Sequence, residues 1–208
     1  MTPIDEATAA AGRGELIVMP TDTVYGIGTR PDDPVATAGL FEAKGRPRAL
    51  TLPVLVPSVE VARGVARFDE RVERLASECW PGPLTLILTR TEASGPWDLG
   101  DDTETIGVRV PRHPLALAVL RGAGPLAVTS ANRSGEPPAR TCGELESAFG
   151  DLVAVYLCGD EPLEGLASTV LDLAHGDARL LRSGALNEDH IAQLLGPGVP
   201  LLHSPLSG

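Results

Sequence analysis

Short aliphatic runs recur along the chain and alternate with amphipathic segments. Val, Ile and Leu cluster between turn residues, which is typical of short buried strands. Residues 168–173 and 178–181 flank His175-Gly176-Asp177, a spacing that predicts a closing hairpin. The other predicted strands are 15–19, 52–56, 84–89, 105–110, 126–129 and 152–157.

Helix signals separate these strands. Proline at a first turn predicts helices over 34–43, after Asp33, and over 114–121, with Gly122 beyond the end. Thr141 and Glu144 have the spacing of a capping box. Further helices are predicted over 69–79 and from the Asn187 cap to about 195. Strands that alternate with helices predict an α/β fold, and the hairpin makes the expected sheet mixed.

Composition indicates one folded unit with a core of its own. The 208 residues are 43% hydrophobic and 22% charged, and no repeat or low-complexity linker divides them, so we expect a single domain over 1–208. No run approaches the ~18 apolar residues of a membrane span, and the chain opens with Asp5 and Glu6 rather than a basic leader. We therefore expect a soluble, cytoplasmic protein.

The three cysteines, Cys79, Cys142 and Cys158, are far apart in the sequence. Their number is odd and their spacing fits neither a zinc site nor a dense disulfide scaffold. We expect buried or idle thiols.

The distribution of charge predicts a pocket for small anions. The net charge is −11, which argues against a broad nucleic-acid surface. Yet nine of the 17 basic residues and one of the 28 acidic residues, Glu136, lie in segments 44–56, 105–112, 126–140 and 178–185. Cations gathered in a few stretches punctuated by Gly and Pro are what such a pocket requires.

The first candidate segments are 20–28 and 44–48. Residues 20–28 (PTDTVYGIG) place hydroxyls, a carboxylate and two glycines after a strand, which suits a ligand-binding turn or, taken alone, a structural one. Lys44-Gly45-Arg46-Pro47-Arg48 follows a predicted helix. These cations either complement that helix end in water or bind a ligand. Lys44 is the only lysine in the chain, which hints at an ammonium that contacts a phosphate oxygen.

Two further segments carry polar groups at predicted strands. Alternation puts Thr105, Gly107 and Arg109 on one face of their strand, where the arginine is either solvated or bound to a carboxylate. Residues 129–135 (TSANRSG) allow two interpretations. They form either a turn whose side chains hydrogen-bond to its own backbone or a substrate-binding loop at the end of a strand.

No local pattern identifies a nucleophile. His113 fits a helix cap or turn and His175 a hairpin turn, while His190 and His203 have no partner at metal-ligand spacing, and no metal ligands are predicted. Chemistry driven by positioning and charge neutralisation fits these residues better than covalent catalysis.

Taken together, seven motifs in order resemble the YrdC/TsaC family of threonylcarbamoyl-adenylate synthases. They are PTDTVYGIG, KGRP, WPGPLTLIL, VRVP, TSANRSG, STVLDL and LRSG, spread over about 15–185, with a C-terminal tail from about 196 to 208. The resemblance implies a YrdC-like α/β domain whose twisted mixed sheet, with flanking helices, lines a concave cavity. It also implies a nucleotidyltransferase that condenses L-threonine, bicarbonate or CO2, and ATP to L-threonylcarbamoyl-AMP and pyrophosphate. That product supplies the modification of adenosine 37 in tRNAs reading ANN codons.

The resemblance also implies roles for individual residues. L-Threonine would be bound by Thr23, Arg109, Val128 and Ser168. ATP would be bound by Lys44, Arg46, Thr105, Ser130, Asn132, Pro138 and Arg182, with Lys44 and Arg46 stabilising charge. Mg2+ is expected on the ATP phosphates, and transfer to tRNA would fall to partner proteins, with direct tRNA binding weak.

Two alternatives stay open at this point. The family commonly has Lys or Asn and then Pro-Leu where this chain has Leu50, Thr51 and Leu52, and it has Pro in place of Ser183. Because related domains handle carbamoyl phosphate and carbamoyl-adenylate, a biosynthetic enzyme of that kind is one alternative. An RNA-binding or ribosome-associated module is the other.

Overall fold

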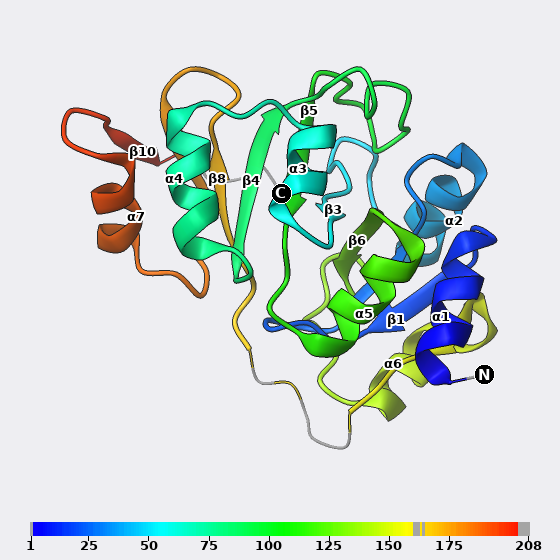
Figure 1. The fold of residues 1–208 in the computed structure, drawn as a ribbon. Helices are drawn as coiled ribbons and strands as arrows, with labels where there is room; N and C mark the ends of the chain where they lie inside the picture. Colours follow the sequence, from blue (N-terminus) through cyan, green and yellow to red (C-terminus); the bar gives the residue numbers. More distant parts are fainter. Residues whose placement is uncertain (1, 160–162, 164, 204–208) are drawn as a thin grey trace.

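The computed structural model describes residues 2–159, 163 and 165–203 and shows an α/β fold built on one mixed sheet (Figure 1). Ten strands lie in the order β10-β9-β8-β4-β5-β3-β6-β2-β1-β7 within the described residues. Their bounds are β1 Leu16–Met19, β2 Gly26–Thr29, β3 Val54–Leu55, β4 Leu84–Thr89, β5 Thr105–Arg109, β6 Leu126–Ser130, β7 Val153–Tyr156, β8 Thr169–Asp172, β9 Ala178–Arg182 and β10 Leu201–His203.

The sheet combines parallel and antiparallel pairs, as predicted. β4 pairs in parallel with β8 and antiparallel with β5. β8 and β9 form the predicted antiparallel hairpin. Segments far apart in the sequence, such as Thr85 and Val170, are therefore brought into register on neighbouring strands.

The helices begin where the capping residues predict. Asp33 accepts hydrogen bonds from Val35 N and Ala36 N at the start of α2, and Thr141 and Glu144 form the predicted capping box. The bounds are α1 Pro3–Gly12, α2 Pro34–Lys44, α3 Val59–Val65, α4 Glu70–Cys79, α5 Pro114–Ala123, α6 Cys142–Phe149 and α7 Glu188–Leu195, with a 3-10 turn η1 at Gly150–Leu152.

Aliphatic side chains fill the core between the sheet and its helices. Helix α1 packs on α5, and α4 packs on α7 at the other side of the molecule (Figure 1). Ile17 and Met19 of β1 and Leu126 of β6 belong to the cluster that contains the buried faces of α1 and α5. This packing fixes the strands that carry the polar segments.

Several elements differ from the prediction. Gly26–Thr29, predicted as part of a turn, is strand β2, which lies between β6 and β1 in the sheet. A Cβ at Gly26 would lie 2.6 Å from Cγ1 of Val128, so the two glycines of this strand allow close strand packing. Helix α5 continues past Gly122, where a Cβ would lie 2.7 Å from Thr8 of α1, because helix packing overrides the stop signal.

The C-terminal region and one helix were also missed. Helix α3 carries a Ser58 cap that the pattern did not single out. Within the predicted tail, Leu201–His203 pairs in parallel with β9 as strand β10. Residues 204–208 of that tail lie outside the described residues.

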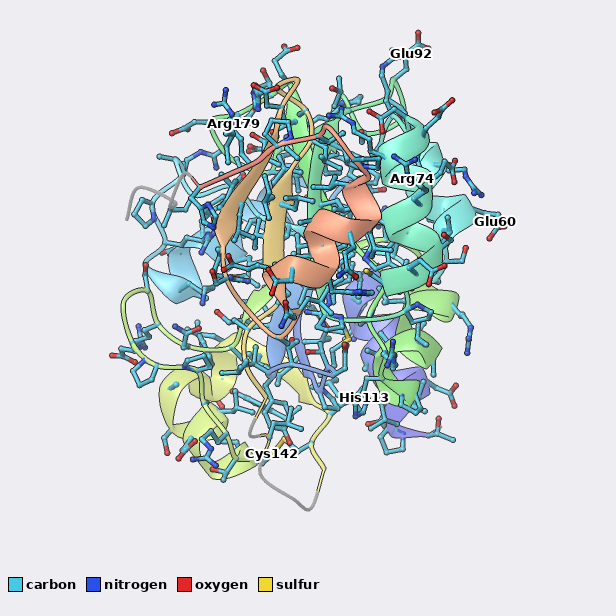
Figure 2. The ribbon with its side chains drawn as sticks, turned by 90° about the vertical axis from the view of Figure 1, so that its left-hand side faces the viewer. Glu60, Arg74, Glu92, His113, Cys142 and Arg179 are labelled. Atoms are coloured by element: carbon cyan, nitrogen blue, oxygen red, sulfur yellow. A yellow bond between two sulfur atoms is a disulfide. The ribbon has the colours of Figure 1, made fainter. Side chains whose placement is uncertain are left out.

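The prediction of idle thiols is wrong for two of the three cysteines. Cys142, the first residue of α6, forms a disulfide with Cys158, which follows β7. Figure 2 shows Cys142 at the lower end of the molecule. The pair meets because α6 packs against β7, a contact that sequence spacing does not reveal. Cys79 is a buried free thiol, as predicted, and burial raises its pKa.

No helix in the described ranges is both long enough and apolar enough to cross a membrane.

Candidate active site

A cavity of about 370 Å³ opens over the sheet. Lining residues two positions apart on one strand, such as Thr85 and Ile87 or Gly107 and Arg109, point to the same face. The strands contribute Gly26 (β2), Leu55 (β3), Thr85 and Ile87 (β4), Gly107 and Arg109 (β5), Val128, Thr129 and Ser130 (β6), Val170 (β8) and Arg182 (β9). Loop residues within 21–25, 46–53, 132–138 and 167–168 complete the wall.

Arg109 is held on three sides within the cavity wall. Its Nε donates to Gly82 O at 3.0 Å, its Nη1 to Thr23 Oγ1 at 2.9 Å and its Nη2 to Asp22 Oδ1 at 2.6 Å. The predicted strand alternation is confirmed for residues 106–109, because Arg109 and Gly107 line the cavity while Ile106 and Val108 lie in the core. Thr105, predicted on the same face, lies outside the lining. A guanidinium has five N–H donors, so two remain for a ligand once these three bonds to described residues are counted.

The turn after β1 presents Thr23 to Arg109. Thr21 Oγ1 accepts from Thr23 N at 3.2 Å and donates to Val24 O at 2.6 Å, so the hydroxyl of Thr21 shapes this turn. Gly165 packs directly against the Thr23 carbonyl, where a Cβ would clash with it. This close approach brings the segment that leads to Ser168 beside the turn.

Ser168, which immediately precedes β8, and Arg182 of β9 form a second set of hydrogen-bonded polar side chains in the cavity wall. Arg182 donates from Nε to Ser168 O and from Nη2 to Ser168 Oγ, each at 3.0 Å. The Ser168 hydroxyl also lies 2.9 Å from Thr85 Oγ1. A Cβ at Gly184 would lie 2.5 Å from the Ser168 carbonyl carbon, so glycine permits this approach of the two chain segments.

Arg46 reaches the cavity from the loop after α2. That helix ends at Lys44 and is capped by Gly45, which has a φ of 60° in the left-handed conformation. Arg46 then donates from Nε to Leu50 O at 2.7 Å and from Nη2 to Thr51 O at 3.1 Å. Leu50 and Thr51 thus supply backbone carbonyls that orient the arginine.

Two arginines of the cavity lining have no carboxylate partner among the described residues, and Glu136 is the one acidic residue of that lining. Neither Arg46 nor Arg182 forms an ion pair with a carboxylate of the described residues, whereas Arg109 is paired with Asp22. Burial lowers the pKa of Arg46, and the nearby charge of Arg182 lowers it further. Burial likewise lowers the pKa of Arg182. Both guanidiniums stay charged at neutral pH, so this part of the cavity favours an anionic ligand.

Lys44 supports the cavity from behind. Its side chain is 2% exposed and is not part of the cavity lining. Its ammonium donates to Ser130 O at 2.7 Å and to the Asn132 carbonyl, and Asn132 Oδ1 lies 3.5 Å away. Burial and the charge of Arg46 lower the pKa of Lys44 to about 8. The only lysine therefore clamps the turn that carries Ser130 and Asn132.

The structure brings most of the predicted site residues together. Two lie outside the lining, namely Lys44 and Thr105, whose hydroxyl donates to the Asp102 carboxylate. Those that line the one cavity are Thr23, Arg46, Arg109, Val128, Ser130, Asn132, Pro138, Ser168 and Arg182.

Sequence reasoning missed Thr85 and Asp22. Thr85 stands in the apolar run 84–89, where the partly polar alternation could have marked it as facing away from the core. Asp22 lies in a motif that the sequence did single out, but its partner Arg109 is 87 positions away. Only tertiary structure pairs them.

Known proteins resemble this chain over most of its length. The family model Sua5_yciO_yrdC, described as "Telomere recombination", matches residues 9–184. The chain belongs to the Sua5/YciO/YrdC family. A relative from Mycobacterium tuberculosis is 42% identical over 194 residues, covering 93% of this chain and 89% of the relative. The threonylcarbamoyl-AMP synthase of Bacillus subtilis is 35% identical over 93% of this chain and 57% of its own length.

Solved structures of the Sua5/YciO/YrdC family have the same fold. P. abyssi Sua5 complexed with L-threonine matches with a TM-score of 0.85 and 33% identity over 95% of this chain. This chain spans 58% of that protein. E. coli YciO matches with a TM-score of 0.81 and 26% identity over 88% of this chain and 90% of YciO. These likenesses confirm the predicted fold class and family.

Proposed function

We propose that this protein is an L-threonylcarbamoyladenylate synthase. It condenses L-threonine, bicarbonate or CO2, and ATP into L-threonylcarbamoyl-AMP, and it releases pyrophosphate. The observation that carries the proposal is the single cavity in which Arg46, Arg109 and Arg182 meet. Relatives in the family are named threonylcarbamoyl-AMP synthases, which supports this assignment.

In this proposal L-threonine lies at the Arg109 side of the cavity. The two N–H donors of Arg109 that remain bind the threonine carboxylate bidentately. Thr23 and Ser168 offer hydroxyls nearby, and Val128 gives an apolar wall. The solved complex of the family member Sua5 with L-threonine supports an amino acid as ligand.

ATP lies at the Arg46 and Arg182 side, where neither arginine forms an ion pair with a carboxylate of the described residues. Ser130, Asn132 and Pro138 line this part of the cavity, and Lys44 holds the turn of Ser130 and Asn132 from behind. Thr105 is the first residue of β5, lies outside the cavity lining and donates a hydrogen bond to Asp102. It would act on ATP only through the position of the strand.

Catalysis follows from charge neutralisation. The threonine amine first adds to CO2 and loses a proton to give a carbamate; when bicarbonate is the carbon source, one water is released as well. A carbamate oxygen then attacks the α-phosphorus of ATP, the bond from that phosphorus to the bridging oxygen of the β-phosphate breaks, and pyrophosphate leaves. This step brings negative charges together, so the fixed guanidiniums of Arg46 and Arg182 stabilise the transition state. Their carbonyl and hydroxyl partners hold them in place before the substrates arrive. No covalent nucleophile is needed.

Mg2+ enters the proposal bound to ATP. Glu136 supplies a carboxylate to the cavity lining, and the described part of the chain has no cluster of three or more His, Cys, Asp or Glu that could hold a metal. The residues present thus fit an ion that is held mostly by phosphate oxygens and water. The ion would neutralise phosphate charge alongside the arginines.

Pyrophosphate release tests the proposal. Wild-type protein is incubated with ATP and Mg2+, with or without L-threonine and bicarbonate, and pyrophosphate is measured. Release that depends on both threonine and bicarbonate supports the synthase. Release that requires carbamoyl phosphate instead would replace it with a carbamoyl-adenylate enzyme. Salt-dependent tRNA binding without turnover would favour the RNA-binding alternative, against which the −11 net charge weighs.

The wider reaction sequence is part of the same proposal. The product is an activated acyl-adenylate, and its threonylcarbamoyl group would be passed to adenosine 37 of tRNA by partner proteins in the cytoplasm.

A further inference from the structure

Two hydroxyl groups on neighbouring strands meet inside the cavity. Thr85 Oγ1 on β4 lies 2.9 Å from the Oγ of Ser168, which immediately precedes β8. Both residues are more than nine-tenths buried, at 5% and 6% exposure. The parallel register of Leu84 with Thr169 fixes this meeting.

Arg182 determines whether the Ser168 hydroxyl donates or accepts in each of its hydrogen bonds. Its Nη2 donates to Ser168 Oγ at 3.0 Å, and a guanidinium offers only donors. Ser168 Oγ must therefore accept this bond, and its own proton must point elsewhere. The proton points either to Thr85 or into the cavity.

Thr85 allows the Ser168 proton to turn into the cavity at little cost. When an anionic ligand accepts that proton, the Thr85 hydroxyl can rotate and donate to the second lone pair of Ser168 Oγ. Ser168 then donates one bond and accepts two, which satisfies its full capacity. Without the Thr85 hydroxyl, the second lone pair of this buried oxygen would lose its partner.

We propose that Thr85 is a positioning residue that holds Ser168 in the orientation in which its hydroxyl donates to an anionic oxygen of the substrate. The inference rests on the proposed function, in which Ser168 belongs to the threonine side of the cavity. Thr85 acts on the substrate only through Ser168, whose hydroxyl also accepts a hydrogen bond from Arg182.

A double-mutant cycle tests this role. Thr85→Val and Thr85→Ser are made in the wild-type protein and in Ser168→Ala, and L-threonine binding is measured by calorimetry together with KM and kcat for pyrophosphate release. Thr29→Val serves as the matched control. Thr29 is also buried in a strand, but it lies outside the cavity and its hydroxyl has no hydrogen-bond partner among the described residues.

Thr85→Val is expected to weaken L-threonine binding about five- to tenfold and to raise KM with little change in kcat, the size of effect typical for one hydrogen bond. Thr85→Ser restores binding, and Thr29→Val leaves it unchanged. In the Ser168→Ala background the same Thr85→Val change should cost less than about twofold, because the partner is gone.

Two results would overturn the inference alone: wild-type affinity in Thr85→Val, or an equal loss in both backgrounds, which would indicate a merely structural role. A wild-type protein that binds neither L-threonine nor ATP overturns the proposed function, and this inference with it.

Discussion

Nη2 of Arg109 lies 2.6 Å from Oδ1 of Asp22, and both side chains are largely buried, at 6% and 13% exposure. The same carboxylate oxygen accepts the backbone N–H of Arg112 at 2.7 Å. Arg109 therefore brings oriented donors to the cavity but little net charge. Arg46 and Arg182, which lack a carboxylate partner among the described residues, supply the positive charge.

Removal of Arg109 should destabilise the fold as well as impair binding. Arg109→Ala leaves the Asp22 charge buried without its partner, and such a change costs about 3–5 kcal/mol of unfolding free energy. Adding Asp22→Asn removes that charge and should recover part of the loss. Urea unfolding of both variants measures the difference. If Arg109→Ala and the double variant had equal unfolding free energies, the unpaired Asp22 charge would not be the cause of the destabilisation.

Loss of either unpaired arginine should weaken nucleotide binding. Arg46→Ala and Arg182→Ala each remove a charged donor, so ATP affinity should fall on the order of ten- to a hundredfold. Arg121→Ala, at an exposed position on α5, is the control and should bind as the wild type does. Calorimetry at two salt concentrations checks the electrostatic origin. Unchanged affinity in both cavity variants would exclude this side as the phosphate site.

Lys44 should titrate near pH 8. Burial and Arg46 lower its pKa from 10.5 to about 8, and as the only lysine it gives one unambiguous side-chain signal. A pH titration of 13C-labelled lysine by NMR measures the value in the folded protein and in urea. A folded-state value near the ordinary one would contradict the burial argument.

The shift of Lys44 also sets the sign of a stability change. Between pH 8 and 10.5 the unfolded chain binds more protons at this residue than the folded chain, so its contribution to stability rises with pH across that window. Lys44→Met has no such titration. The stability of the wild type relative to this variant should therefore increase from pH 8 to 10, as measured by denaturant unfolding. A difference in unfolding free energy that does not change with pH would contradict the lowered pKa of Lys44.

The disulfide should stabilise the protein in oxidising buffer. Cys142 and Cys158 are 16 positions apart, and a loop of this size is worth about 3 kcal/mol in the chain-entropy account. Reduction, or Cys142→Ser with Cys158→Ser, should lower the unfolding free energy by about that amount. Alkylation and mass spectrometry should find Cys79 protected until unfolding. Rapid labelling of all three cysteines without reductant would disprove the bond.

Thr29 offers a simple gain in stability. Its buried hydroxyl has no hydrogen-bond partner among the described residues, so Thr29→Val removes a desolvation cost while keeping the shape of the side chain. We expect a gain of about 1 kcal/mol in unfolding free energy. Thermal unfolding checks it, and a lower Tm would indicate that the hydroxyl is satisfied.

Local chemistry predicted much of the secondary structure. The strand Leu84–Thr89 and the helix caps Asp33, Thr141 and Asn187 depend on neighbouring residues alone, and they were predicted correctly. Gly26–Thr29 was missed because two glycines predict a turn when the packing of Val128 against them is unknown.

The site shows the same division. Ordered motifs indicated the family and most of the predicted lining residues, because these residues stand within or beside segments with a local signature. The role of Lys44 could not be predicted, because the carbonyls it holds are 86 and 88 positions away. An ammonium that could have faced a phosphate faces backbone instead.

The sequence by itself determined the α/β alternation, the capped helix starts, the hairpin and the gathering of cations into a few segments, because these depend on short-range spacing and side-chain chemistry. Tertiary structure alone decided that Arg109 meets Asp22, that Thr85 meets Ser168, and that Cys142 meets Cys158. Such pairs depend on strand order and register in the sheet, and long-range packing fixes these.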